Sequence, residues 1–250
     1  MDINVLDLFS GIGGFSLGLE RAGMKTVAFC EIDKKCQIVL KKHWSNLPIF
    51  EDITKLTGDM LSERIDVICG GFPCQDISFA GKGAGLAGER SGLWWEFHRL
   101  IKEIKPKFVI IENVSALRSR GLDEVLGSLA EIGYDAEWHC IPASAVGAPH
   151  QRDRIWIICY PHGSDAARKG RAFVTNDCFK KWSTTKNIKE RHEWIDELVS
   201  RNVALQADSY SDALRILDGI PNRVDRLKQL GNSIVPQIAE FIGKEVIKWA

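Results

Sequence analysis

Short apolar runs alternate with amphipathic stretches along the first 160 residues, and this alternation constrains the fold more than any other feature of the sequence. Strands rich in valine and isoleucine that are separated by helices are typical of a mostly parallel sheet covered on both faces. Since crossovers between parallel strands are right-handed, the alternation predicts an α/β, doubly wound, Rossmann-like fold. The predicted strands cover residues 3–8, 26–30, 65–69, 108–111, 136–141 and 154–160, and the predicted helices cover 14–22, 34–42, 92–104 and 122–132.

The alternation is lost after residue 160, where charge rises and Trp182 and Trp194 stand among basic side chains. An amphipathic helical pattern returns at 235–249, where apolar residues recur three and four positions apart. We therefore predict three parts of the chain: a main domain over 1–159, a small recognition region over 160–218, and a C-terminal segment over 219–250 that returns to the main domain.

The formal net charge is zero, with 33 basic and 33 acidic residues, which argues against a wholly basic nucleic-acid binder. The charge is unevenly distributed, because segment 160–191 contains eight basic and three acidic residues and carries +5. A segment of this kind suits either a solvated loop or a surface that contacts phosphates. The charge pattern alone leaves both interpretations open.

The seven cysteines include no Cys-x-x-Cys pair, which argues against a disulfide scaffold and against a zinc site of ordinary spacing. No apolar run approaches the roughly 20 residues that span a bilayer, and the first residues lack the features of a signal peptide. We therefore expect a cytoplasmic protein with reduced thiols, no bound metal and no membrane segment. Most cysteines in such proteins are small buried side chains, and we expect burial of Cys30, Cys69, Cys140 and Cys159.

A glycine-rich turn over residues 7–15 follows the first predicted strand and opens the first helix. Glycines at such a turn let the backbone bend sharply and approach a ligand closely. Glu31 lies 20 residues beyond Gly11, where an acidic side chain can accept hydrogen bonds from ribose hydroxyls, and Asp52 and Ile53 follow where they can reach an adenine ring. The alternative is a plain strand–turn–helix connection with a capping carboxylate.

Pro73 and Cys74 follow the third predicted strand directly, at the edge where α/β sheets place their ligands. Cys74 stands in a Gly/Pro turn and not in an apolar run, so it is a candidate nucleophile on a rigid elbow. The glycine-rich segment 76–92 comes next, and its position beside Cys74 predicts a lid.

Three further motifs carry charged or polar side chains. Glu112 ends the strand 108–111, where it faces either the same sheet edge as Cys74 or simply solvent. Arg152 and Arg154 alternate into the last predicted strand, which would place both on one face, and two neighbouring cations favour an anionic or polar ligand. A Gly-Asn-Ser turn, 231–233, precedes the final helix.

Together, in this order, the motifs resemble those of the DNA (cytosine-5)-methyltransferase family over residues 3–158 and 220–248. The short chain and the stretch 218–226 are similar to the phage and prophage branch of the family. Two features depart from the pattern. His150 stands where the family often has glutamine, and 160–218 is short for a complete target-recognition domain.

The resemblance implies an S-adenosylmethionine-dependent methyltransferase fold in which Cys74 attacks C6 of a cytosine flipped out of double-stranded DNA. Glu112 would bond N3 and the exocyclic amine, Arg154 would hold O2, and Arg152 would neutralise a phosphate or help to activate Cys74. A monomer that acts beside a restriction endonuclease is implied as well. The residues implied to bind S-adenosylmethionine are Phe9, Gly11, Gly13, Gly14, Glu31, Asp52, Ile53, Pro73, Leu93, Asn232 and Ser233.

Three alternatives stay open beside this interpretation. One branch of the family has nearly the same catalytic motifs and methylates a transfer RNA. A non-catalytic DNA-binding relative would keep the fold, but it would have no use for Cys74, Glu112 and Arg154 together. A nicotinamide-dependent oxidoreductase would use the same glycine turn and Glu31, and would leave Cys74 and Glu112 without a role.

Overall fold

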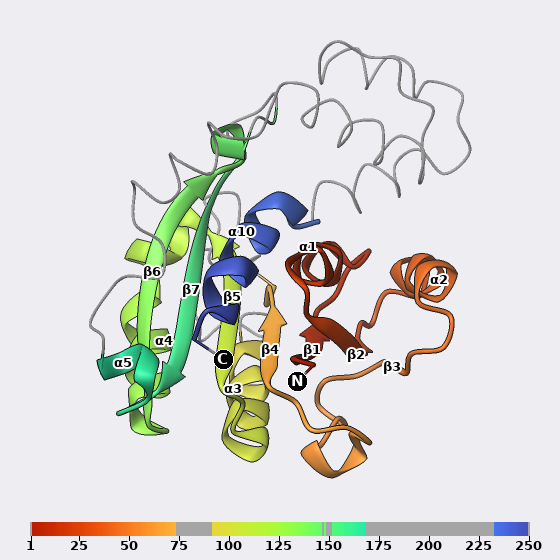
Figure 1. Cartoon of the computed structure of the whole chain (residues 1–250), viewed down its shortest axis with the longest axis horizontal. Helices are drawn as coiled ribbons and strands as arrows, with labels where there is room; N and C mark the ends of the chain where they lie inside the picture. Colours follow the sequence, from red (N-terminus) through yellow and green to blue (C-terminus); the bar gives the residue numbers. More distant parts are fainter. Residues whose placement is uncertain (1, 74–91, 147, 149–151, 169–232, 250) are drawn as a thin grey trace.

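A computed structural model describes residues 2–73, 92–146, 148, 152–168 and 233–249. Seven strands form one sheet in the order β3-β2-β1-β4-β5-β7-β6 (Figure 1). The neighbours from β3 to β5 pair in parallel, whereas β7 runs antiparallel to both β5 and β6. The strands are β1 (Asn4–Leu8), β2 (Lys25–Cys30), β3 (Ile49–Phe50), β4 (Val67–Gly70), β5 (Phe108–Val114), β6 (Tyr134–Pro142) and β7 (Asp153–Pro161).

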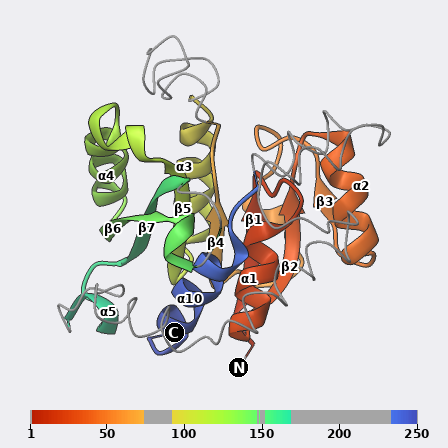
Figure 2. The ribbon, with the colours of Figure 1, turned by 90° about the horizontal axis from the view of Figure 1, so that it is seen from above.

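Helices cover both faces of the sheet, with α1 and α10 on one side and α3 and α4 on the other (Figure 2). The predicted class, a mostly parallel doubly wound α/β fold, is therefore confirmed. The sequence analysis missed β3 and α5, which are too short to show a periodic pattern. The helices are α1 (Gly14–Ala22), α2 (Lys34–His43), α3 (Leu93–Ile104), α4 (Leu122–Glu131), α5 (Asp165–Arg168) and α10 (Pro236–Ile247), and short 3-10 turns are η1 (Gly58–Met60), η3 (Ser115–Ser119) and η4 (Ala143–Val146).

The continuous apolar runs of the strands are explained by two hydrophobic clusters, one on each face. Ile110 belongs to the cluster beneath α1 and α10, and Ile111, the next residue, belongs to the cluster beneath α3 and α4. Successive strand residues point to opposite faces, so a strand covered on both sides needs apolar residues at every position. No helix in the described part of the chain is long and apolar enough to cross a membrane.

Cysteine burial follows this arrangement with one exception. Cys30, Cys69 and Cys159 are buried, as expected. The expectation for Cys140 is wrong, because this residue is exposed on the edge strand β6. Trp138 lies on the same face of β6 and is also exposed, so the described helices leave this end of the strand uncovered.

The C-terminal helix α10 packs tightly on the N-terminal helix α1. A Cβ atom at Gly18 would lie 2.3 Å from the carbonyl oxygen of Pro236, and one at Gly243 would lie 2.8 Å from the Cβ of Ala22. Both distances are far below van der Waals contact, so only glycine allows the two helices to approach this closely.

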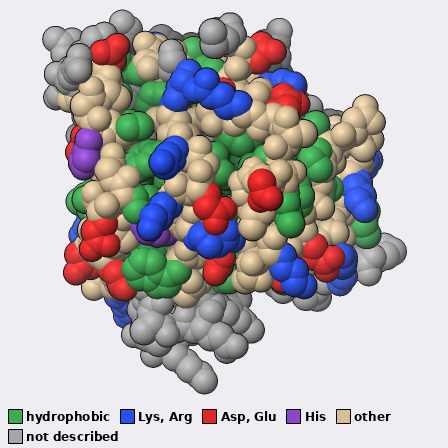
Figure 3. All heavy atoms as spheres, turned by 90° about the horizontal axis from the view of Figure 1, so that it is seen from below, with side chains coloured by type: hydrophobic (Ala, Val, Ile, Leu, Met, Phe, Trp, Pro, Cys, Tyr) green, Lys and Arg blue, Asp and Glu red, His purple; other side chains and the backbone are tan. Residues whose placement is uncertain are grey.

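Charged side chains at the amino ends of the parallel strands are paired with each other. Lys25 contacts Glu63 at 3.1 Å, and Asp66 accepts contacts from Arg64 at 3.7 Å and Lys107 at 3.5 Å. Figure 3, which views the molecule from this side, shows basic and acidic side chains interspersed over the surface. This edge of the sheet is therefore an ordinary solvated surface, and the unusual polar groups lie at the other edge.

Asp7, near the carboxyl end of β1, is fully buried. Its Oδ2 accepts hydrogen bonds from the Ser16 hydroxyl at 2.7 Å and from the Ser16 backbone N–H at 3.3 Å. Burial raises the pKa of Asp7 to about 7 despite these bonds, and the charge of Glu31 adds to the rise. The folded protein therefore holds a proton on Asp7 at pH values where the unfolded chain has released it.

We expect the stability of the wild type to fall, relative to that of Asp7→Asn, as the pH rises from 5 to 7. The folded state binds one proton more than the unfolded state in this window, so the difference changes by about 1.4 kcal/mol per pH unit. Urea unfolding at several pH values measures it. Asp2→Asn, at an exposed carboxylate, is the control and should follow the wild type. If the free energies of unfolding of the wild type and of Asp7→Asn changed equally with pH, the raised pKa of Asp7 would be contradicted.

Candidate functional site

The carboxyl ends of the parallel strands β1 to β5 meet at one edge of the sheet. Since β7 runs antiparallel to β5, its amino end lies at this edge too. Open α/β sheets bind their ligands at the carboxyl edge. Eight described residues of the predicted site follow, end or begin these strands: Phe9 after β1, Glu31 after β2, Asp52 and Ile53 after β3, Pro73 after β4, Glu112 in β5, and Arg152 and Arg154 at the start of β7.

The glycine-rich turn after β1 is bonded to Glu31 at the end of β2. The backbone N–H of Gly11 donates to Glu31 Oε2 at 2.7 Å. Phe9 and Gly11 both have left-handed backbone conformations, with φ of 53° and 54°. Among the described residues, a Cβ atom at Gly11 would meet nothing within 4 Å beyond its chain neighbours, so the turn leaves space at Gly11, whose N–H bonds the Glu31 carboxylate. The chain can therefore place a ligand against both groups.

Gly13 and Gly14 are needed for packing, which the sequence analysis did not anticipate. A Cβ atom at Gly13 would lie 2.6 Å from the Trp44 ring. At Gly14 it would lie 2.9 Å from the Ser233 hydroxyl and 2.8 Å from the carbonyl oxygen of Ile234. Gly14 thus brings the segment before α10 against the glycine-rich turn, and this explains how Ser233 comes to lie near residues at the start of the chain.

Glu31 is buried and bonded through both carboxylate oxygens, since Oε1 accepts the backbone N–H of Asp33 at 2.7 Å and Oε2 accepts that of Gly11. Burial raises the pKa of Glu31, and the bonds from Asp33 and Gly11 oppose the rise. The next residue, Ile32, is 69% exposed and was missed by the sequence analysis. The sequence does contain a signal for Ile32 as a candidate contact residue, because an apolar residue stands there between Glu31 and Asp33, just after a strand.

Asp52 opens a tight turn at the same edge. Its Oδ1 accepts the hydroxyl of Thr54 at 2.7 Å and the Thr54 backbone N–H at 3.0 Å. These bonds lower the pKa of Asp52, so the carboxylate is charged at neutral pH. The Ile53 side chain is only 5% exposed and belongs to the hydrophobic core beneath the turn. Ile53 anchors the turn, and Asp52 presents a charge on it.

The loop after β4 lies directly against Glu112 and Asn113 of β5. The Asn113 side-chain amide donates to the carbonyl oxygen of Phe72 at 3.1 Å. A Cβ atom at Gly71 would lie 2.9 Å from Glu112 Oε2, so a larger residue there would displace the carboxylate. The bond from Asn113 fixes the backbone immediately before Pro73, the last described residue of this loop.

Glu112 is a buried carboxylate paired with Arg154, whose Nε lies 2.9 Å from Glu112 Oε1. Burial raises the pKa of Glu112, while the charges of Arg154 and Arg152 oppose the rise. Arg152 lies just before β7 with φ of 38°, so it does not continue the strand alternation that the sequence analysis expected. Its guanidinium instead donates to the carbonyl oxygen of Ser233 at 2.7 Å.

Several predicted residues lie outside the described part of the chain. They are Cys74, His150, Asn232, most of the segment 76–92 and most of the region 160–218. Leu93 is described and begins α3, on the other side of the gap that follows Pro73. Among the described residues, no three His, Cys, Asp or Glu side chains gather as metal ligands would.

Comparison with known proteins identifies close relatives. Residues 3–218 match the family model of C-5 cytosine-specific DNA methylases. Type II methyltransferase M.CviJI of Paramecium bursaria Chlorella virus IL3A is 42% identical over 160 residues, 63% of this chain and 43% of that protein. M.HhaI of Haemophilus parahaemolyticus is 35% identical over 162 residues, 63% of this chain and 49% of that protein. The matched part thus spans less than half the length of these curated relatives.

Solved structures resemble the chain as well. A protein described as a prophage-encoded DNA modification methyltransferase of E. coli has a TM-score of 0.66 at 21% identity, over 99% of both chains. A mutant of Spodoptera frugiperda DNMT2 has a TM-score of 0.55 at 21% identity, over 65% of this chain and 51% of that chain. These similarities confirm the predicted methyltransferase fold.

We expect Gly71→Ala to destabilise the protein by about 1–3 kcal/mol, because the added methyl group forces the buried Glu112 carboxylate away from Arg154. Gly127→Ala is a matched control. Gly127 lies within α4, where an added Cβ atom meets no neighbour within 4 Å in the described part of the chain, and the substitution should stabilise by up to about 1 kcal/mol. Urea unfolding of both variants, repeated in a Glu112→Ala background, measures the coupling. If Gly71→Ala lowered the free energy of unfolding equally in the wild-type and Glu112→Ala backgrounds, Glu112 would not be the group that the methyl group displaces.

Proposed function

The chain belongs to the C-5 cytosine-specific DNA methylase family, and from this we propose that it methylates C5 of cytosine in double-stranded DNA with S-adenosylmethionine as methyl donor. The observation that carries the proposal is the ion pair of buried Glu112 with half-buried Arg154, which lies against the loop that leads to Pro73. A dehydrogenase would have no need of this arrangement beside its cofactor site. A binding module would have no need of a buried carboxyl group with a raised pKa.

Cytosine C5 is a poor nucleophile, and the proposed reaction overcomes this through Cys74. Its thiolate forms a bond to C6, and the electron pair of the C5–C6 double bond moves toward N3, which leaves an enamine carbon at C5. S-adenosylmethionine, when bound, supplies the methyl group that C5 takes up. A base then takes the C5 proton, and the electron pair left behind restores the C5–C6 double bond and expels the thiolate from C6.

Glu112 supplies the acid that this sequence of steps requires. Negative charge develops at N3 when the thiolate attacks, and a carboxyl group beside N3 that can donate a proton stabilises it. Burial raises the pKa of Glu112, which favours its protonated form, and Arg154 keeps the group oriented. In the proposed reaction Arg154 holds the cytosine O2 beside the same group. Arg152 contributes positive charge that favours a phosphate or the Cys74 thiolate.

The groups at the other end of the edge fit the adenosine part of the cofactor. The Glu31 carboxylate, beside the open space at Gly11, accepts hydrogen bonds from the two ribose hydroxyls. Exposed Ile32 offers an apolar contact to a planar ring, and the charged Asp52 accepts a hydrogen bond from an exocyclic amine. Phe9, Pro73, Leu93, Asn232 and Ser233 complete the proposed site.

The target base has to leave the duplex before Cys74 can reach C6, since C6 is inaccessible in the stack.

We assign sequence recognition to region 160–218, inserted between a catalytic domain over 1–159 and a C-terminal segment over 219–250. Its basic part, 160–191, supplies phosphate contacts that position the protein. The protein acts as a monomer and as the partner of a restriction endonuclease.

We expect the wild type to form a denaturant-resistant complex with duplex DNA that contains 5-fluorocytosine, provided that S-adenosylmethionine is present. Fluorine cannot leave C5 as a cation, so the bond between Cys74 and C6 persists. Cys74→Ser should form no complex, because its hydroxyl is hardly ionised at neutral pH. Cys140→Ser, at an exposed thiol, is the control and should form the complex normally. Denaturing gel electrophoresis detects it.

The same experiment separates the competing functions. Glu112→Gln should slow formation of the complex because N3 loses its acid. A complex on transfer RNA but not on duplex DNA would move the proposal to the RNA-modifying branch. A wild type that methylates DNA without forming the complex, or a complex with Cys74→Ser, would refute the covalent mechanism.

We expect Glu31→Ala to weaken binding of S-adenosylhomocysteine by roughly 1.5–3 kcal/mol, because charge-assisted hydrogen bonds to the ribose are lost. DNA binding should change much less. Glu51→Gln removes a nearby exposed charge without touching the turn, and its affinity should equal that of the wild type. Calorimetric titration measures both. Unchanged affinity in Glu31→Ala would refute the ribose assignment.

A further inference from the structure

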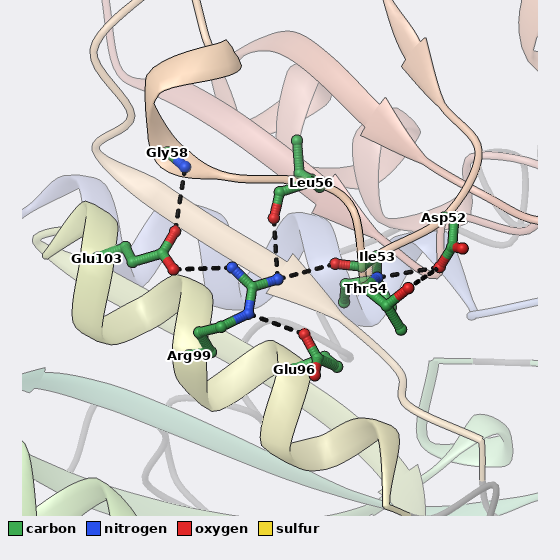
Figure 4. A network of polar contacts seen from close by, with 8 residues as sticks. All are labelled: Asp52, Ile53, Thr54, Leu56, Gly58, Glu96, Arg99 and Glu103. Carbon is green, nitrogen blue, oxygen red and sulfur yellow. Dashed lines mark hydrogen bonds and ion pairs between the residues drawn. The ribbon is translucent and has the colours of Figure 1, made fainter.

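Arg99 of α3 links four groups on two parts of the chain (Figure 4). Its Nε and one terminal nitrogen contact Glu96 and Glu103, each at 2.8 Å, on its own helix. The other terminal nitrogen donates to the backbone carbonyl oxygens of Ile53 and Leu56, each at 2.9 Å. One guanidinium group therefore bonds the turn that begins at Asp52 to helix α3.

Glu103 extends this link, because its second oxygen accepts the backbone N–H of Gly58 at 3.1 Å. The turn is also bonded internally, since the carbonyl oxygen of Asp52 accepts the N–H groups of Lys55 and Leu56. Its internal bonds hold the turn in one conformation. Three contacts from α3, to backbone atoms of Ile53, Leu56 and Gly58, hold the turn in position against the helix (Figure 4).

A role in stability alone does not explain this arrangement well. The Arg99 side chain is 30% exposed, and ion pairs on such surfaces contribute little to stability. The two carbonyl bonds hold Ile53 and Leu56, one and four residues after Asp52, the carboxylate that we assign to the adenine amine. A displacement of about 1 Å in a positioned group has large effects on binding and catalysis.

We propose that Arg99 is a positioning residue for the cofactor: it holds the turn of residues 52–56 so that Asp52 meets the adenine ring. The inference rests on the proposed function. Arg99 contacts neither Glu31 nor Gly11 in any of its four bonds, so its effect is confined to the adenine end of the site.

Lysine cannot replace Arg99 in this role. The planar guanidinium directs its donors in a fixed fork, and Arg99 uses four of them at once on two carboxylates and two carbonyl oxygens. A lysine ammonium carries all its donors on one atom at the end of a flexible chain. Arg99→Lys keeps the charge beside Glu96 and Glu103 and loses the hold on the turn.

Two ligands that differ only in adenine test the inference. S-adenosylhomocysteine contains the base, whereas S-ribosylhomocysteine lacks it and keeps the ribose and amino acid. Calorimetric titration of the full chain should show that the wild type prefers the first ligand. In Arg99→Met we expect the affinity for S-adenosylhomocysteine to fall by about tenfold, as for one lost charge-assisted hydrogen bond, with the affinity for S-ribosylhomocysteine unchanged. Lys102→Met, which removes an exposed cation from the same helix, should match the wild type.

Arg99→Lys provides a second measurement that does not depend on how Arg99→Met folds, and it should also lose the adenine preference. An unchanged preference in these variants, or equal losses for both ligands, would overturn the inference while leaving the proposed function intact. A wild type that binds S-adenosylhomocysteine without preferring it would also overturn the inference. A wild type that binds neither ligand would overturn the proposed function, and the inference with it.

Discussion

In the antiparallel pairing of β5 with β7, Arg154 lies opposite Val114, and Glu112 lies opposite Trp156 on the same strand pair. A parallel β7 would have carried its arginines to the far edge of the sheet. The reversal brings the amino end of β7 to the carboxyl ends of the parallel strands, where Arg154 meets Glu112. The carboxyl group remains buried and oriented because this cation accompanies it, and the proposed chemistry depends on both properties.

The sheet edge also organises the ligand groups by the strands that they follow. Glu31 and Asp52 come after β2 and β3, whereas Pro73 follows β4 and Glu112 lies in β5. Between them lies β1, whose glycine-rich turn bonds to Glu31. The cofactor end and the catalytic end of the proposed site are therefore neighbours because their strands are neighbours, and no long-range movement is needed to assemble the described parts.

Period and spacing in the sequence were sufficient to predict the doubly wound sheet and helices α1, α2, α3, α4 and α10, because apolar burial on two faces leaves a strong pattern. Glu31, Asp52 and Glu112 lie at the predicted carboxyl edge for the same reason, because they follow strands of this sheet or lie near the end of one. Other features depend on contacts between distant segments and leave no local pattern. The packing roles of Gly13 and Gly14, the exposure of Cys140 and the bonds of Arg99 to Ile53 and Leu56 are of this kind.

The contact of Gly14 with Ser233 and Ile234 joins segments more than 200 residues apart in the chain. Closing so long a loop carries an entropic cost that must be met before the contact forms, and proteins rich in such contacts fold slowly. A ribosome makes the glycine-rich turn near the start of synthesis and the segment with Ser233 and Ile234 more than 200 residues later. Most of the chain has to be made before this segment can reach Gly14, so we expect the contact to form after the local pairing of the parallel strands.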